Sequence, residues 1–167
     1  MTTSASARVI VDLAGPEATE ALGHRLAALV QPGDLIVLTG ELGAGKTTLT
    51  RGLGAGLGVR GPVTSPTFVV ARRHPHPSGG TELIHVDAYR VGTAEEIDDL
   101  DLLDRADEAV TVVEWGAGRV EHLAPSRLRV DLVEDEQDPL RREAHIEGIG
   151  PRWVGTDLTV LASPTDA

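Results

Sequence analysis

The sequence predicts an α/β fold, a three-layer sandwich around a mostly parallel β-sheet with antiparallel edge strands. Stretches in which apolar residues recur at helical spacing alternate along the chain with short apolar runs. Two of these runs, residues 35–39 and 109–113, are almost continuously apolar, which is typical of strands buried on both faces. A glycine-rich segment, residues 40–45, separates the first of these strands from a helical stretch.

Two strands and two helices are predicted in the first part of the chain. Residues 8–13 alternate in polarity and predict a short strand. Residues 17–30 place their apolar side chains on one face of a helix, which the turn-forming residues 31–34 end. After the buried strand at 35–39 comes a predicted helix over residues 46–57, whose helix propensity is reduced by three glycines.

Four strands and one helix are predicted in the rest of the chain. The helix opens with a capping box formed by Thr93 and Glu96 and runs to about Ala106. A loop at residues 74–80 joins the first two strands. The strands are expected at residues 68–71, 83–86, 109–113 and 127–133.

The composition excludes several classes of protein. The chain has 167 residues, of which 41% are hydrophobic, so we expect one folded domain over residues 1–167, with residues 1–7 and about 163–167 disordered. It has no cysteine, which excludes a disulfide scaffold, a thiol nucleophile and a thiolate metal site. No signal peptide precedes the domain and no apolar run approaches the roughly 18 residues of a membrane span, so we expect a soluble, cytoplasmic protein.

A phosphate-binding motif follows the first buried strand. Residues 40–47, Gly-Glu-Leu-Gly-Ala-Gly-Lys-Thr, match the pattern G-x-x-x-x-G-K-[ST] between a strand and a helix, which predicts a sandwich of the P-loop NTPase type. A glycine-rich turn would match these four fixed positions by chance in on the order of one chain in several hundred. In such a loop the backbone N–H groups and the helix dipole attract phosphate. The residues expected to contact nucleotide here are Leu42, Gly43, Ala44, Gly45, Lys46, Thr47 and Thr48.

The distribution of basic residues supports this interpretation. Lys46 is the only lysine of the chain, and arginine fills the other basic positions. A compact ammonium group suits a phosphate loop better than a planar guanidinium does. We therefore expect Lys46 to reach the β- and γ-phosphates and the Thr47 hydroxyl to bind Mg²⁺.

Two acidic residues stand at the ends of predicted strands. Asp87 ends the strand at 83–86 and Glu114 ends the strand at 109–113. Ligands of open α/β sheets bind at the carboxyl ends of the strands, so both acids are candidate catalytic or metal-binding residues if their strands run parallel to the one before the phosphate loop. The alternative is that either acid only caps a strand at the surface.

The segment between the phosphate-loop helix and the next strand is a candidate switch. Residues 61–68, Gly-Pro-Val-Thr-Ser-Pro-Thr-Phe, contain hydroxyl side chains, among them Thr64, and two prolines that favour an extended backbone. Nucleotide enzymes of this class often place a γ-phosphate sensor at this point of the chain. A plain connecting loop is the alternative, and the residue types do not decide between them.

Taken together, these segments resemble the TsaE family, small bacterial ATPases of tRNA threonylcarbamoyladenosine biosynthesis. The resemblance is carried in order by the phosphate loop at 40–48, Thr-Ser-Pro-Thr-Phe at 64–68, His-Val-Asp-Ala-Tyr-Arg at 85–90, and Glu-Trp at 114–115. It extends from about residue 17 to residue 144. One departure is Ala88, where the family usually has a larger apolar residue.

The resemblance implies ATP and Mg²⁺ as cofactors, with the metal on Thr47 and Glu114 and with Asp87 close to it. It also implies nucleotide contacts near Glu17 and Arg142. Its implied partners are the two proteins that transfer the threonylcarbamoyl group to tRNA, so that tRNA is contacted only indirectly and no membrane is involved. The net charge of −11 agrees with this, because a protein that grips nucleic acid alone is usually basic. We expect slow hydrolysis by the isolated protein.

Two other functions are compatible with the same residues. The first is a small-molecule kinase, in which an acceptor hydroxyl takes the place of water. The second is a nucleotide-gated interaction module that hydrolyses nothing. Labelled ATP incubated with a metabolite pool separates the kinase from the ATPase, because only a kinase labels a metabolite.

Overall fold

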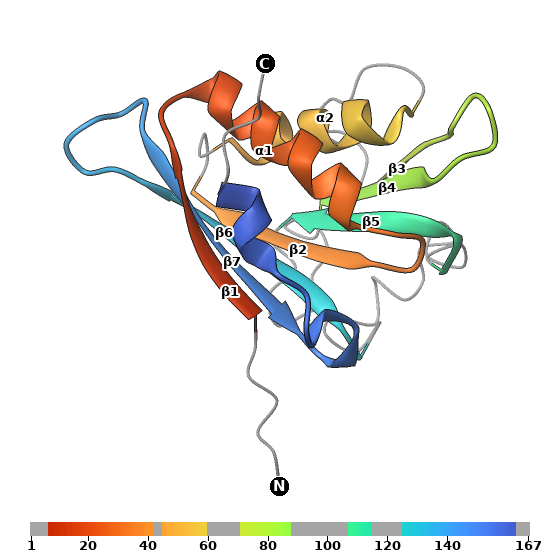
Figure 1. The fold of residues 1–167 in the computed structure, drawn as a ribbon. Helices are drawn as coiled ribbons and strands as arrows, with labels where there is room; N and C mark the ends of the chain where they lie inside the picture. Colours follow the sequence, from red (N-terminus) through yellow and green to blue (C-terminus); the bar gives the residue numbers. More distant parts are fainter. Residues whose placement is uncertain (1–6, 42–44, 60–70, 88–106, 115–124, 163–167) are drawn as a thin grey trace, which may run out of the picture.

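The computed structural model describes the chain in five stretches: residues 7–41, 45–59, 71–87, 107–114 and 125–162. Strands and helices alternate in its first half (Figure 1). The strands are β1 (Ala7–Leu13), β2 (Leu35–Gly40), β3 (Ala71–His74), β4 (Glu82–Asp87), β5 (Ala109–Glu114), β6 (Arg127–Glu134) and β7 (Arg142–Ile149). The helices are α1 (Pro16–Leu29), α2 (Lys46–Leu57) and the short 3₁₀ helices η4 (Pro151–Trp153) and η5 (Leu158–Ala162). No helix in these stretches is long and apolar enough to cross a membrane.

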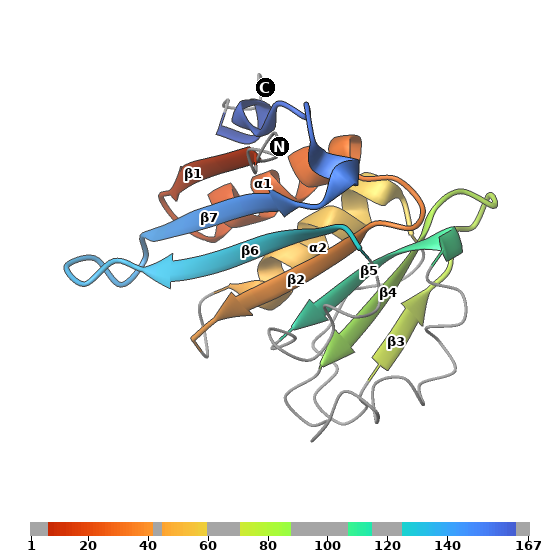
Figure 2. The same ribbon diagram turned by 90° about the horizontal axis from the view of Figure 1, so that it is seen from below.

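The described strands form a single sheet of order β1-β7-β6-β2-β5-β4-β3 (Figure 2). This confirms the predicted α/β fold. The sheet is less parallel than predicted, however: the pairings β6–β2, β2–β5 and β5–β4 are parallel, whereas β1–β7, β7–β6 and β4–β3 are antiparallel. The difference arises because β7 was not predicted, and its hairpin with β6 makes one half of the sheet antiparallel.

Helices α1 and α2 lie side by side on one face of the sheet (Figures 1 and 2). Glycines bring their backbones into contact. A Cβ atom on Gly52 would lie 2.0 Å from the carbonyl oxygen of Glu20, and one on Gly23 would lie 2.3 Å from that of Leu49. The glycines that lower the helix propensity of α2 are thus used for close packing, which offsets their cost.

The two halves of the sheet are buried differently. On the face opposite α1 and α2, Val37, Val86 and Val113 of β2, β4 and β5 are at most 2% exposed. On the same face of the antiparallel half, Ile10 is 53% and Val133 46% exposed. The strands around β2 are therefore covered on both faces, as the predicted three-layer sandwich requires. The helix predicted from Thr93 to Ala106 lies outside the described residues.

Most strand and helix predictions are confirmed, and three need correction. β3 begins no earlier than Ala71 in the described chain and continues to His74, where we expected a loop; residues 68–70 lie outside the described stretches. Its charged residues fit an edge strand, because Arg73 pairs with Glu82 at 2.5 Å across the ladder. Ala7, expected to be disordered, is paired with Gly148 as the first residue of β1. The remaining residues of the predicted disordered ends are not described.

The third correction is β7, together with the segment after it. In β7 the inward positions hold Ala144, Ile146 and Gly148, a weak apolar signal between charged residues. Gly148 leaves room for Trp153, which is 1% exposed; a Cβ on Gly148 would lie 2.6 Å from the Cβ of Trp153. Trp153, to which the sequence assigned no function, is therefore a core residue.

Arg152 fastens the C-terminal segment to the turn before β2. Its guanidinium lies 4.2 Å from the centre of the Trp153 ring and donates to both carboxylate oxygens of Asp34, at 3.0 and 3.1 Å. It also donates to the carbonyl oxygen of Leu29, at the end of α1, at 3.1 Å. Asp34 is 6% exposed, so this pair sits largely out of solvent.

Candidate nucleotide-binding site

The phosphate-loop segment lies between the end of β2 at Gly40 and the start of α2 at Lys46. Gly45 occupies the N-cap position of α2 with φ of +106°, a conformation that favours glycine. A Cβ atom here would also lie 3.4 Å from Cγ2 of Thr19, in the first half of α1. Gly45 therefore lets the loop turn into α2 and lie close against α1. Leu42, Gly43 and Ala44 lie outside the described residues.

Lys46 is 7% exposed, and its ammonium group lies over the phosphate-loop backbone. Its Nζ donates to the carbonyl oxygen of Gly40 at 2.8 Å and to that of Glu41 at 3.1 Å. Burial lowers the pKa of Lys46, and the carboxylates of Glu114, Asp87 and Glu41 act in the opposite direction. The only lysine of the chain thus shares an electrostatic environment with both candidate acids.

Asp87 and Glu114 lie next to each other at the carboxyl edge of the sheet. They are register partners on the parallel strands β4 and β5, and Glu114 is in turn the partner of Leu38 on β2. The condition set by the sequence, that both strands run parallel to β2, is met. Glu114 is 4% exposed, which does not fit a strand cap at the surface, whereas Asp87 is half-buried.

The side chains at this edge suit a hard divalent cation. Thr47 lies in the first turn of α2 and is half-buried, as is Thr48. The Thr47 hydroxyl and the carboxylates of Glu114 and Asp87 offer only oxygen donors, which Mg²⁺ prefers, and Mg²⁺ commonly combines one or two carboxylates with phosphate oxygens. The residues present therefore fit the metal that the sequence predicts.

A small hollow of about 100 Å³ borders the phosphate loop. Residues at the start of α1, around the start of α2 and in the β6–β7 hairpin line this hollow. Arg142 borders it and is held by its own hairpin, since its Nη1 donates to the carbonyl oxygens of Arg141, at 3.0 Å, and Pro139. The residues around the hollow are Gly15, Pro16, Thr19, Gly45, Thr48, Leu140 and Arg142.

The predicted site residues are only partly brought together. Arg142 borders the hollow, but Glu17 is exposed in the first turn of α1 and does not border it. Leu140, 65% exposed beside the hollow, was missed by the sequence reasoning, because a lone leucine in a polar turn carries no motif. Thr64 and the rest of the candidate switch lie outside the described residues.

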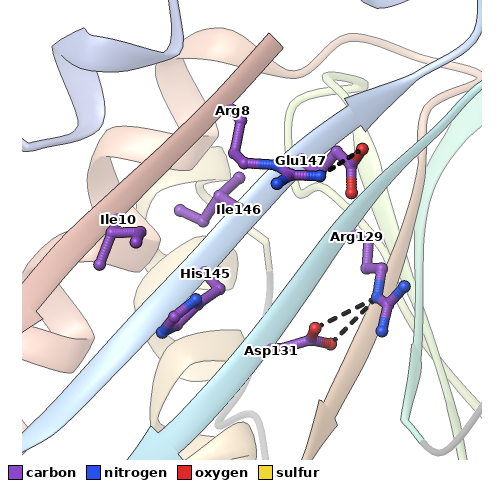
Figure 3. A pocket seen from close by; sticks show the side chains of 7 residues that line it. All are labelled: Arg8, Ile10, Arg129, Asp131, His145, Ile146 and Glu147. Carbon is purple, nitrogen blue, oxygen red and sulfur yellow. Dashed lines mark hydrogen bonds and ion pairs between the residues drawn. The ribbon is translucent and has the colours of Figure 1, made fainter. Parts of the chain in front are cut away.

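A second hollow, of about 290 Å³, lies on the open face of β1, β7 and β6 (Figure 3). Its charged side chains pair with one another. Arg8 lies 3.2 Å from Glu147, and Arg129 lies 3.2 Å from Asp131. None of its residues was predicted to be functional. Although this hollow is larger, the chemistry of the phosphate loop, the lysine and the paired acids favours the first site.

Comparison with known proteins agrees with the motifs. Residues 13–144 match the family model described as threonylcarbamoyl adenosine biosynthesis protein TsaE. The chain is 56% identical over 145 residues to the tRNA threonylcarbamoyladenosine biosynthesis protein TsaE of Streptomyces coelicolor, which covers 84% of this chain and 97% of that one. It is 37% identical over 139 residues to the Bacillus subtilis protein of the same name, covering 83% and 84%. A crystal structure of Bacillus subtilis YdiB is similar to 90% of this chain and 92% of that one, with a TM-score of 0.72 and 29% identity.

Proposed function

The chain belongs to the TsaE family of tRNA threonylcarbamoyladenosine biosynthesis proteins, and we propose that it serves this pathway as a Mg²⁺-dependent ATPase. It acts as an accessory protein on the two-protein complex that transfers the threonylcarbamoyl group to the adenosine beside the anticodon. Its action takes place in the cytoplasm. The observation that carries the proposal is the convergence of Lys46, Asp87 and Glu114 at the end of β2.

In this proposal the phosphate loop binds and orients the ATP phosphates. Lys46 exchanges its two carbonyl partners for phosphate oxygens, and the N–H groups at the start of α2 direct their dipole at the same charge. Thr47, Glu114 and Asp87 hold Mg²⁺, which when bound neutralises charge on the phosphates. Thr48, Arg142 and the start of α1 border the rest of the nucleotide.

We propose that the isolated protein hydrolyses ATP slowly. In P-loop GTPases such as Ras a glutamine orients the attacking water. Gln31 precedes the first residue of β2, whereas the phosphate loop follows the last residue of that strand. Gln137 lies in the β6–β7 turn. Docking of the partner complex then completes the site.

The partners, rather than this chain, hold the tRNA. A net charge of −11 disfavours direct contact with the phosphate backbone, since nucleic-acid binding depends on neutralising phosphates with basic side chains. ATP binding and hydrolysis change the contacts between this protein and the transferase complex, so that the chain resets the complex between turnovers.

Hydrolysis measured with and without the partner pair tests the proposal. We expect a low rate alone, stimulation by the pair, and modified tRNA only when all components are present. Lys46→Ala should weaken nucleotide binding by at least about 100-fold, because a phosphate-binding ammonium group is lost. Arg51→Ala, an exposed position on the same helix, is the control and should bind normally.

Two results would contradict parts of this account. An isolated rate already equal to that of the full complex would contradict the accessory role. Normal nucleotide binding by Lys46→Ala would contradict the site itself. Transfer of labelled phosphate to a metabolite would identify a kinase instead, and ATP binding without any hydrolysis in the presence of the partners would identify a nucleotide-gated module.

A further inference from the structure

His85, in the middle of β4, is a buried polar residue that the roles assigned above do not use. Its side chain is fully buried, and neither ring nitrogen has a hydrogen-bond partner in the described parts of the chain. A buried polar group without a hydrogen bond destabilises the folded state, because it has lost its water and gained no partner. Native structures contain few such groups, and each calls for a physical reason.

The position of His85 in the sheet supplies that reason. It lies between Leu83 and Asp87 in the alternation of β4, and Leu83 packs in the core with leucines of α1 and α2, so these side chains point to the face of the sheet that the two helices cover. Its register partner on β5 is Val112, two residues before Glu114. The imidazole therefore lies on the same face of the sheet as the two carboxylates, two residues further from the carboxyl edge.

The carboxylate of Glu114 lies within ion-pair distance of the ring. Nε2 of His85 lies 3.3 Å from Oε2 of Glu114, and the two side chains are 0% and 5% exposed. This separation is within ion-pair range, but the N–H direction is not that of a hydrogen bond. The two groups are therefore close enough for a hydrogen bond to form if either side chain turns.

We propose that His85 is a positioning residue that orients the Glu114 carboxylate toward the cation of the nucleotide site. The inference rests on the proposed Mg²⁺–nucleotide function. A donor held at one carboxylate oxygen restricts rotation of the group, and a ligand that is already oriented loses less entropy when the metal binds. Carboxylate ligands of metals are generally held by such outer hydrogen bonds, and loss of one typically costs 10-fold to 100-fold in metal affinity or activity.

His74 provides a matched control from the neighbouring strand. It is also a buried histidine, 6% exposed, and its Nε2 has no hydrogen-bond partner in the described chain. It lies on β3, whereas Glu114 lies on β5, with β4 between them. His74 and His85 influence each other electrostatically, but a substitution at His74 removes a buried imidazole and leaves the contact between His85 and Glu114 in place.

The test compares ADP binding with Mg²⁺ and with EDTA by isothermal titration calorimetry. The ratio of the two affinities measures the metal contribution. We expect His85→Leu to reduce that ratio by about 10-fold or more while the affinity in EDTA stays the same. His74→Leu should leave the ratio unchanged.

Two conservative variants separate positioning from general packing. His85→Gln keeps an amide N–H near the place of Nε2 and should retain most of the metal contribution. His85→Asn keeps an N–H only near the place of Nδ1, so this variant should lose the metal contribution to ADP affinity. Both retain a buried amide, so this pair decides the question even if His85→Leu does not fold.

Two outcomes overturn the inference: an unchanged ratio in His85→Leu, or equal ratios in the Gln and Asn variants. If the ratio is unchanged because the affinity falls equally with Mg²⁺ and with EDTA, His85 only supports the fold. If instead the wild-type protein binds ADP without any dependence on Mg²⁺, the proposed function fails, and that result is recognised before any variant is made.

Discussion

The two halves of the sheet differ in how their outer face, the one opposite α1 and α2, is buried. Around β2, β4 and β5 the strands are apolar on both faces, and the outer side chains such as Val113 are buried. In β1, β7 and β6 the outer face is open to solvent, and it carries ion pairs such as Arg8 with Glu147 together with the exposed Ile10 and Val133. Residues of both halves share one continuous core with α1 and α2, so the difference lies on the outer face.

This difference explains where the candidate site lies. Strands covered on both faces have little freedom to shift, and their carboxyl ends hold Asp87 and Glu114 side by side beside Lys46. The half formed by β1, β7 and β6, which we call the open half, contributes Arg142 and Leu140 at the rim of the site, from a hairpin. The half formed by β2, β4 and β5, which we call the doubly covered half, thus carries the chemistry that needs fixed geometry. The open half contributes the adaptable contacts.

The largest expected effect comes from the same substitution on the outer face of each half. Val113→Asn places an amide in a fully buried position and should lower the free energy of unfolding by about 3–4 kcal/mol. Val133→Asn, at a residue 46% exposed, should cost less than about 1 kcal/mol. Urea unfolding followed by circular dichroism measures both. Equal costs would mean that the two halves do not differ as described.

A smaller effect is expected from removing one arginine of an ion pair in each environment. Arg152→Ala leaves the carboxylate of Asp34 largely buried without its guanidinium and should cost about 2 kcal/mol. Arg8→Ala breaks an exposed pair and should cost less than about 1 kcal/mol. The same unfolding experiment compares them, and a larger loss for Arg8→Ala would reverse the ranking.

The smallest effect concerns pH. Burial lowers the pKa of His74 below its ordinary value of 6.5, with the charges of His85 and Arg72 acting in the same direction. Between the two values the unfolded chain binds more protons than the folded chain, so stability falls as pH drops from about 6.5 toward the folded pKa. His74→Gln should flatten this part of the curve of unfolding free energy against pH. An unchanged slope would show that His74 is not responsible.

The parts of the fold that could be predicted are those with strong local signals. Helix α2 begins at Lys46 and ends at Leu57 as predicted, because the phosphate-loop motif fixes its start and Gly58 ends it with φ of +81°. Strand β7 could not be recognised. Its inward residues are small, and the residues that it pairs with on β1 lie 129 to 141 positions away in the sequence.

The same reasoning applies to the site. Asp87 and Glu114 were predicted because each ends an apolar strand, and the parallel register places them together. The contact between His85 and Glu114 could not be foreseen, since it depends on the side-chain conformations as well as on the register of β4 and β5. Leu140 borders the site only because the β6–β7 hairpin brings it to the edge where β2 ends.

A crystal structure of the protein grown with ADP and Mg²⁺ tests the central claim most directly. We expect the phosphates on the backbone between Gly40 and Thr48, with the cation against Thr47 and Glu114, at the carboxyl edge of the doubly covered half. Nucleotide bound instead in the hollow beside Arg129 and His145, on the open face of the other half, would contradict the account.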